Sequence, residues 1–169
     1  MPEAWLRGPV PNVHPMLMPG AHALLQASEE MWEAARGLST RELWTSPAGG
    51  AATVGFHLRH IAGSIDRLLT YARGAMLDDR QYAVLATERE PGDPPATAET
   101  LLREAQRVVD VALETIRATP ERALLEPRAV GRQRLPSTVL GLLAHIGDHT
   151  LRHVGQVVTT AKVVSAPRR

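Results

Sequence analysis

Cysteine is absent from the 169 residues, which excludes disulfides, thiolate metal ligands and cysteine nucleophiles. Aromatic residues make up only 4% of the chain, and Lys162 is its single lysine. A core with so few aromatic rings must consist mostly of Leu, Val, Ile and Ala, a composition that favours helices over sheet. No apolar run approaches the ~20 residues needed to cross a bilayer, so we expect no membrane span.

The charge pattern and the N-terminal segment exclude further classes of protein. The formal net charge is +1, and arginines are interleaved with acidic residues, so we expect no nucleic-acid partner. The first twenty residues carry Glu3 and five prolines and lack the basic-then-apolar order of a signal peptide. We therefore expect a cytoplasmic protein with a single domain, in which residues 1–19 form a proline-rich leader and residues 165–169 a frayed tail.

Four segments repeat apolar residues with the period of a helix, and glycine or proline separates them. They cover residues 21–37, 54–73, 97–119 and 138–164, the second capped by Thr53 and the fourth by Ser137. Residues 75–96 are expected to be a long connection with at most one short turn near 82–85, and no segment predicts a strand. These features predict an all-α four-helix bundle.

The connection between the second and third helices is long enough to span the bundle. The expected order is therefore up-down-down-up, with the second and third helices parallel.

The placement of the seven histidines is the most informative feature of the chain. His145, His149 and His153 follow one another at intervals of four residues in the last helix, and His57 and His60 lie three apart in the second. Residues four apart occupy one helix face with their Cβ atoms ~5–6 Å apart. Two imidazoles at that spacing can bind one cation at ~2.0–2.1 Å.

The apolar faces of the two helices select three of these histidines. His149 and His153 continue the apolar face of the last helix, and His60 borders that of the second. The sequence therefore predicts that His60, His149 and His153 meet inside the bundle as metal ligands. Three histidines with a fourth position open are typical of a catalytic zinc site rather than a structural one.

Two other interpretations of the histidines remain open. They can be hydrogen-bonded core residues of a plain bundle that binds no metal. Alternatively, His57 or His145 fills the fourth position, and the closed site belongs to a metal-binding protein without turnover. The Glu-x-x-His pattern of di-iron bundles is absent from the sequence.

Three polar side chains near the histidines are further candidates. Ser64, four residues after His60, is a weak candidate nucleophile, since no oxyanion hole is visible. Asp66 and Asp148 can orient a ligand imidazole, although a solvated surface charge is the more common role.

Glycine recurs inside both histidine-bearing helices, at Gly55, Gly63, Gly141, Gly147 and Gly155. Each glycine in a helix interior costs ~1 kcal/mol relative to alanine. Close helix approach or room beside a ligand would compensate for this cost, and the sequence does not separate the two.

Two sequence motifs resemble a known family. The segment from Thr53 to Gly63, TVGFHLRHIAG, and the segment from His149 to Gln156, HTLRHVGQ, are similar to the two signatures of the DinB-like (DinB/YfiT) metalloproteins. The resemblance implies a four-helix bundle, frequent homodimers and a divalent metal, commonly zinc or nickel, held by His60, His149 and His153. This chain has Val154 where an Arg often stands in the family.

Characterised members of that family use low-molecular-weight thiols for S-transfer or isomerisation. The resemblance therefore implies a metal-dependent thiol transferase, whose partners are a small thiol and an electrophilic substrate. Gln156, one turn beyond His153, is then a candidate residue beside the metal, and Arg59 or Arg152 a candidate for holding a substrate carboxylate. A metal-dependent hydrolase and a stress-related metal-binding protein without turnover are the alternatives.

Overall fold

The computed structural model describes residues 1–166 and is mostly helical. The α-helices are α1 (Met18–Ala35), α2 (Thr40–Trp44), α3 (Val54–Ala72), α4 (Asp79–Thr87), α5 (Ala98–Ala118) and α6 (Val139–Ser165). Two strands, β1 (Pro127–Val130) and β2 (Leu135–Thr138), form one antiparallel hairpin. Short 3₁₀ turns occur at Ala4–Arg7, Pro15–Leu17, Ala48–Gly50 and Glu121–Ala123.

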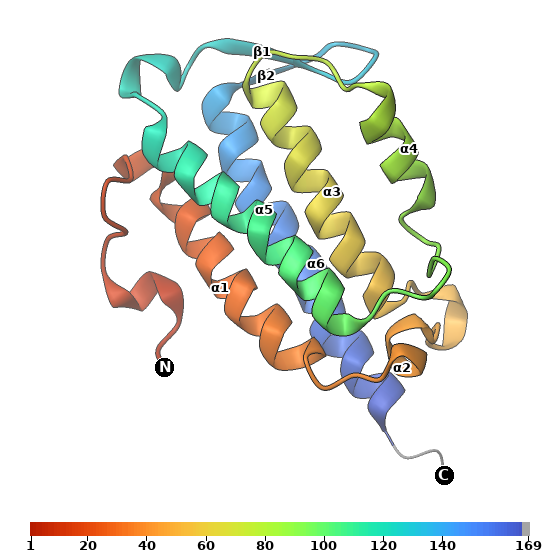
Figure 1. The fold of residues 1–169 in the computed structure, drawn as a ribbon. Helices are drawn as coiled ribbons and strands as arrows, with labels where there is room; N and C mark the ends of the chain where they lie inside the picture. Colours follow the sequence, from red (N-terminus) through yellow and green to blue (C-terminus); the bar gives the residue numbers. More distant parts are fainter. Residues whose placement is uncertain (167–169) are drawn as a thin grey trace.

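Helices α1, α3, α5 and α6 form the bundle, and their apolar faces enclose one core (Figure 1). Helix α6 packs against both α1 and α3, and α5 packs against α3 and α1. In Figure 1, α3 and α5 run toward the hairpin end of the bundle, whereas α1 and α6 run away from it. The mostly helical fold expected from the sequence is confirmed.

The four long helices begin close to where the sequence predicts, and three of them, α3, α5 and α6, begin at a threonine cap. The Thr53 side chain accepts a hydrogen bond from the backbone N–H of Phe56, and Thr138 accepts one from Gly141. The predicted cap of the last helix, Ser137, is wrong by one residue because Ser137 still pairs in strand β2. Helix α1 begins at Met18, three residues before the expected start.

The hairpin contradicts the expectation that the chain has no strand. Pro127 pairs with Thr138 and Val130 with Leu135 across the ladder. Pro127 and Pro136 both lie within strands, although proline usually argues against a strand. They are tolerated because both strands of a two-stranded sheet are edge strands, so a missing N–H can face away from the ladder.

Residues 75–96 are also more ordered than expected, since they contain the nine-residue helix α4. Asp78 begins this helix with a capping box in which Gln81 is the reciprocal partner. The only residue buried within α4 is Gln81, so the helix has no apolar stripe that a periodicity argument could detect. Helix α2, which was also not expected, begins with a capping box between Ser39 and Glu42.

The proline-rich N-terminal segment packs against the bundle. Val10, Val13 and Leu17 are buried in the common core. At the other end, α6 continues to Ser165, and residues 167–169 of the expected frayed tail lie outside the described residues. None of the helices described between residues 1 and 166 is both long and apolar enough to cross a membrane.

One of the interior glycines is explained by close helix approach. A Cβ atom at Gly147 would lie 2.7 Å from the backbone oxygen of Gly20, so the α1 and α6 backbones can meet here only without a side chain. Gly155 differs, because a Cβ atom there would meet nothing within 4 Å.

Candidate metal centre

Three histidines from two neighbouring helices meet at one point of the bundle. His60 lies on α3, and His149 and His153 lie one turn apart on α6. Each offers a ring nitrogen, and these nitrogens all lie within 4.8 Å of one another. The His60 ring centroid is 4.4 Å from that of His153 and 5.2 Å from that of His149. The structure therefore brings together the three histidines that the sequence selects.

The separation of the ring nitrogens is close to what one small cation requires. The Nε2 atoms of His60 and His149 are 3.1 Å apart. Two nitrogens bound to a zinc ion at ~2.0–2.1 Å and at a tetrahedral angle lie ~3.3–3.4 Å from each other. The nitrogens of His60 and His149 are therefore close to that spacing, and the set of three imidazoles fits a divalent ion of zinc or nickel type.

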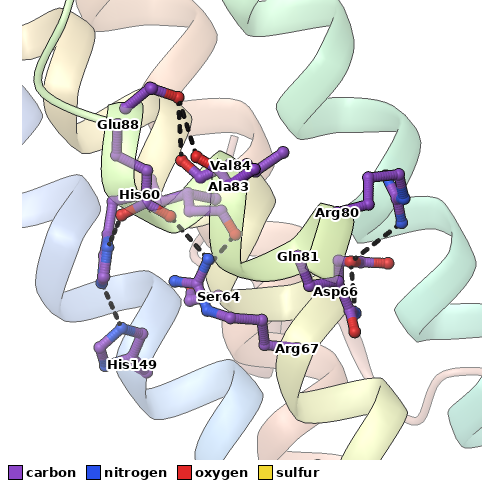
Figure 2. A network of polar contacts seen from close by, with 12 residues as sticks. His60, Ser64, Asp66, Arg67, Arg80, Gln81, Ala83, Val84, Glu88 and His149 are labelled. Carbon is purple, nitrogen blue, oxygen red and sulfur yellow. Dashed lines mark hydrogen bonds and ion pairs between the residues drawn. The ribbon is translucent and has the colours of Figure 1, made fainter. Parts of the chain in front are cut away.

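A buried carboxylate fixes the orientation of His60 (Figure 2). Glu88, at the end of α4, is only 3% exposed, and its Oε2 atom lies 2.7 Å from His60 Nδ1. An ionised carboxylate only accepts hydrogen bonds, so His60 Nδ1 must donate. In the neutral ring, the lone pair is then on Nε2, the atom that faces His149. Such a carboxylate–histidine pair is common behind metal ligands, where it fixes the tautomer.

The Glu88 carboxylate is itself held from a second side. Arg67 Nη1 donates to Glu88 Oε1 at 2.7 Å. Burial alone would raise the pKa of Glu88, but the hydrogen bonds from His60 and Arg67 outweigh burial and hold this pKa below its ordinary value. A Cβ atom at Gly63 would lie 2.5 Å from Glu88 Oε1 and 2.7 Å from Arg67 Nη1, so this glycine makes room for the pair.

His57 supports His153 in a similar way. The His57 side chain is buried, and its Nδ1 atom lies 3.0 Å from His153 Nδ1. One of these nitrogens donates and the other accepts, so His153 has its Nε2 atom left for another partner. Burial, followed by the charge of His60, lowers the pKa of His57 to about 4.

His149 and His153 of α6 are kept neutral near pH 7. Burial and then the nearby His60 charge lower the pKa of His149 to about 4 and that of His153 to about 3. Neutral imidazole is the form that binds metal, so protons do not compete for these two nitrogens except in acid. The low pKa values thus agree with the geometry of the cluster.

Comparison with known protein families agrees with the fold and the cluster. The family model of the DinB superfamily matches residues 23–157, which include all three histidines. The chain belongs to the DinB superfamily. A search of curated proteins gives no match.

Several side chains that the sequence offers as candidates have other contacts in this DinB-superfamily fold. Arg59 donates to the backbone oxygens of Glu90 and Pro91 and thereby holds the segment that follows α4. Arg152 is exposed and pairs with Asp148 at 2.8 Å, while Gln156 is exposed on α6.

The remaining candidates near the histidines are engaged locally or lie at the surface. Ser64 donates to the Ile61 oxygen, and Asp66 accepts from Gln81. His145 is exposed, with its Nδ1 atom 3.6 Å from Asp148. Within residues 1–166, neither His145 nor His57 belongs to the cluster formed by His60, His149 and His153.

Glu88 is the polar residue of the site that sequence reasoning missed. It lies 28 positions after His60, in a segment without apolar periodicity. Only the tertiary contact between α4 and α3 brings it to the imidazole. The nearest sequence signal is Gly63, whose missing side chain leaves space for the carboxylate.

The three-histidine cluster of this DinB-superfamily protein borders a groove of about 620 Å³. His60 and His149 form one end of it, and its walls come from α3, α4, α6 and the turn of the β-hairpin. Much of the wall is apolar, with Leu68, Leu77 and Leu85 among its residues. The groove gives a small molecule a route to the histidine nitrogens.

Proposed function

We propose that this protein is a divalent-metal-dependent enzyme that uses a low-molecular-weight thiol for S-transfer or isomerisation. The observation that carries the proposal is the convergence of His60, His149 and His153 at the end of a substrate-sized groove. Zinc or nickel held by these three residues would act as a Lewis acid and lower the pKa of a thiol that enters the remaining position.

The groove and the role of His57 favour an enzyme over a closed binding site. His57 is engaged in a hydrogen bond with His153, and His145 is exposed. No fourth His, Cys, Asp or Glu joins the three ligands within the part of the chain that the structure describes. A site of three protein ligands next to a groove is the arrangement used for turnover.

The nucleophile must come from outside the chain. The protein has no cysteine, and the Ser64 hydroxyl donates to the backbone oxygen of Ile61. A small thiol is the co-substrate that membership of the superfamily favours. Water in its place would make the protein a hydrolase, an outcome that the experiment below distinguishes.

The chain's own residues have separate roles in this proposal. Glu88 accepts a hydrogen bond from His60 Nδ1 and keeps the Nε2 atom of His60 directed at the metal position. Arg67 compensates the buried carboxylate charge. The apolar groove wall excludes water from the thiol and places the electrophile next to it.

The experiment measures thiol consumption by the metal-loaded protein. Cysteine, glutathione and coenzyme A are each offered with an epoxide or an alkyl halide, before and after chelation of the metal. We expect metal-dependent loss of one thiol, and we expect the His149→Ala variant to lose this activity. The control is His22→Ala, which should retain it, because the His22 imidazole contacts the Gly8 oxygen and not the cluster. Product formation without thiol consumption would indicate hydrolysis, and no turnover with any thiol would contradict the transferase.

The proposal extends to compartment and assembly. Low-molecular-weight thiols are kept reduced in the cytoplasm, and we place the protein there. We also expect a homodimer, as the family resemblance implies. Light scattering coupled to gel filtration would then give a molar mass twice that of a single chain.

A further inference from the structure

Within the part of the chain that the structure describes, the groove beside the three histidines has arginines but no acidic residue in its lining. Two arginines and no Asp or Glu are among the described residues that line it. Arg67 is already paired with Glu88, so its charge is compensated. Arg132 is different, because residues 1–166 provide it with no carboxylate partner within ion-pair distance. One uncompensated cation therefore faces the groove.

Arg132 lies at the hairpin end of the groove, away from His60 and His149. It belongs to the turn between β1 and β2, and its guanidinium carbon lies 4.9 Å from the centroid of the Tyr82 ring. Tyr82 is near the start of α4, whereas Glu88, which contacts His60, follows the end of this helix. At 1.5 Å per residue, the six positions between them span ~9 Å.

The residues that helix α3 contributes to the groove also run from the histidines toward the hairpin. His60, Ser64 and Leu68 line it at successive turns, and Tyr71 continues the same face toward the hairpin. The eleven positions from His60 to Tyr71 correspond to ~16 Å. The groove is therefore elongated, with the metal centre at one end and the free arginine at the other.

We propose that the electrophilic substrate of the site is an anion with an apolar body, whose carboxylate binds Arg132 while its other end reaches His60 and His149. That the substrate is an electrophile rests on the proposed function, whereas the binding of the anion to the groove does not require a metal. Leu68, Leu77 and Leu85 contact the apolar body, and the planar guanidinium, already oriented by Tyr82, receives the carboxylate.

The test uses octanoate as the anionic probe and octanamide as its neutral analogue. Both are titrated into the metal-free full-length protein, so that the carboxylate cannot bind a metal, and amide chemical shifts report the affinity. We expect octanoate to bind more tightly than octanamide. Arg132→Gln should weaken octanoate binding about five- to tenfold and leave octanamide unchanged.

Matched variants separate the groove from a general charge effect. Arg134→Gln removes an exposed charge from the same turn but outside the groove, and should leave octanoate binding unchanged. Leu85→Glu places a carboxylate at the groove wall and should weaken octanoate binding, whereas Val84→Glu should not. Val84 is exposed to nearly the same extent, 42% against 41%, but does not line the groove.

The outcomes distinguish this inference from the proposed function. Equal binding of octanoate and octanamide, equal effects of the two arginine variants, or no binding of octanoate at millimolar concentration would each overturn the substrate class. Thiol turnover could still be found in those cases. Conversely, octanoate binding that depends on Arg132 would stand even if no thiol were consumed.

Discussion

His60 and Glu88 are joined by a 2.7 Å hydrogen bond that connects the interior of α3 to the end of α4. Because Glu88 also accepts from Arg67, one buried carboxylate orients a ligand imidazole and compensates an arginine. The geometry of the histidine cluster thus depends on a segment that carries none of its three histidines.

The first prediction concerns this carboxylate. Glu88→Gln keeps the size of the side chain but removes its charge, so His60 becomes a weaker ligand and Arg67 loses its counter-ion. We expect the affinity for zinc to fall about ten- to hundredfold, measured by competition with a chromophoric chelator. Glu90→Gln, an exposed neighbour, is the control and should retain the affinity of the wild type. Unchanged affinity in Glu88→Gln would refute a role for this residue in orienting His60.

The second prediction concerns the space beside that carboxylate. Gly63→Ala places a Cβ atom 2.5 Å from Glu88 Oε1, so the ion pair must move. We expect a loss of about 1–3 kcal/mol in the free energy of unfolding, measured with urea. Gly155→Ala is the matched control: its Cβ would meet nothing within 4 Å, and the better helix propensity of alanine should stabilise the protein by up to ~1 kcal/mol. Equal destabilisation by Gly63→Ala and Gly155→Ala would show that the Glu88–Arg67 ion pair does not need a glycine at position 63.

The third prediction concerns His57. Because it contacts His153 rather than completing the metal sphere, His57→Ala should leave the coordination number unchanged. The visible absorption of the cobalt-substituted protein would then keep its wild-type intensity, while the affinity decreases because His153 has lost its partner. A change in the position and intensity of the cobalt bands would indicate that the variant has lost a ligand, and so that His57 binds the metal in the wild type.

The fourth prediction concerns the stability of the metal-free protein in acid. The pKa of His149 is lowered to about 4 and that of His153 to about 3, from about 6.5 when unfolded. Between pH 6.5 and these values, the unfolded chain binds more protons than the folded one, so stability must fall as the pH falls. The lowered pKa of Glu88 acts in the same direction at lower pH.

The melting temperature of the metal-free protein should therefore decrease between pH 7 and pH 5. The control is the double variant His149→Ala and His153→Ala, in which the decrease over the same interval should be smaller. A melting temperature that stays constant or rises on acidification would contradict the low pKa values of the two imidazoles.

The long helices could be predicted from the sequence because their apolar residues recur at helical spacing and three of them begin at a local threonine cap. The meeting of His60 with His149 and His153 also follows from that pattern, since each histidine lies on or beside an apolar face that must be buried. Glu88 could not be predicted, because its contact with His60 depends on where α4 packs. The groove likewise depends on the hairpin, whose two prolines obscure its strands.

The central claim, one divalent ion bound by His60, His149 and His153, is tested most directly by the metal content of the purified protein. We predict about one zinc or nickel ion per wild-type chain and a large loss in each of the three single alanine variants. His145→Ala, on the exposed face of α6, should retain the metal. Equal metal content in the wild type and in the variant lacking all three histidines would contradict the account.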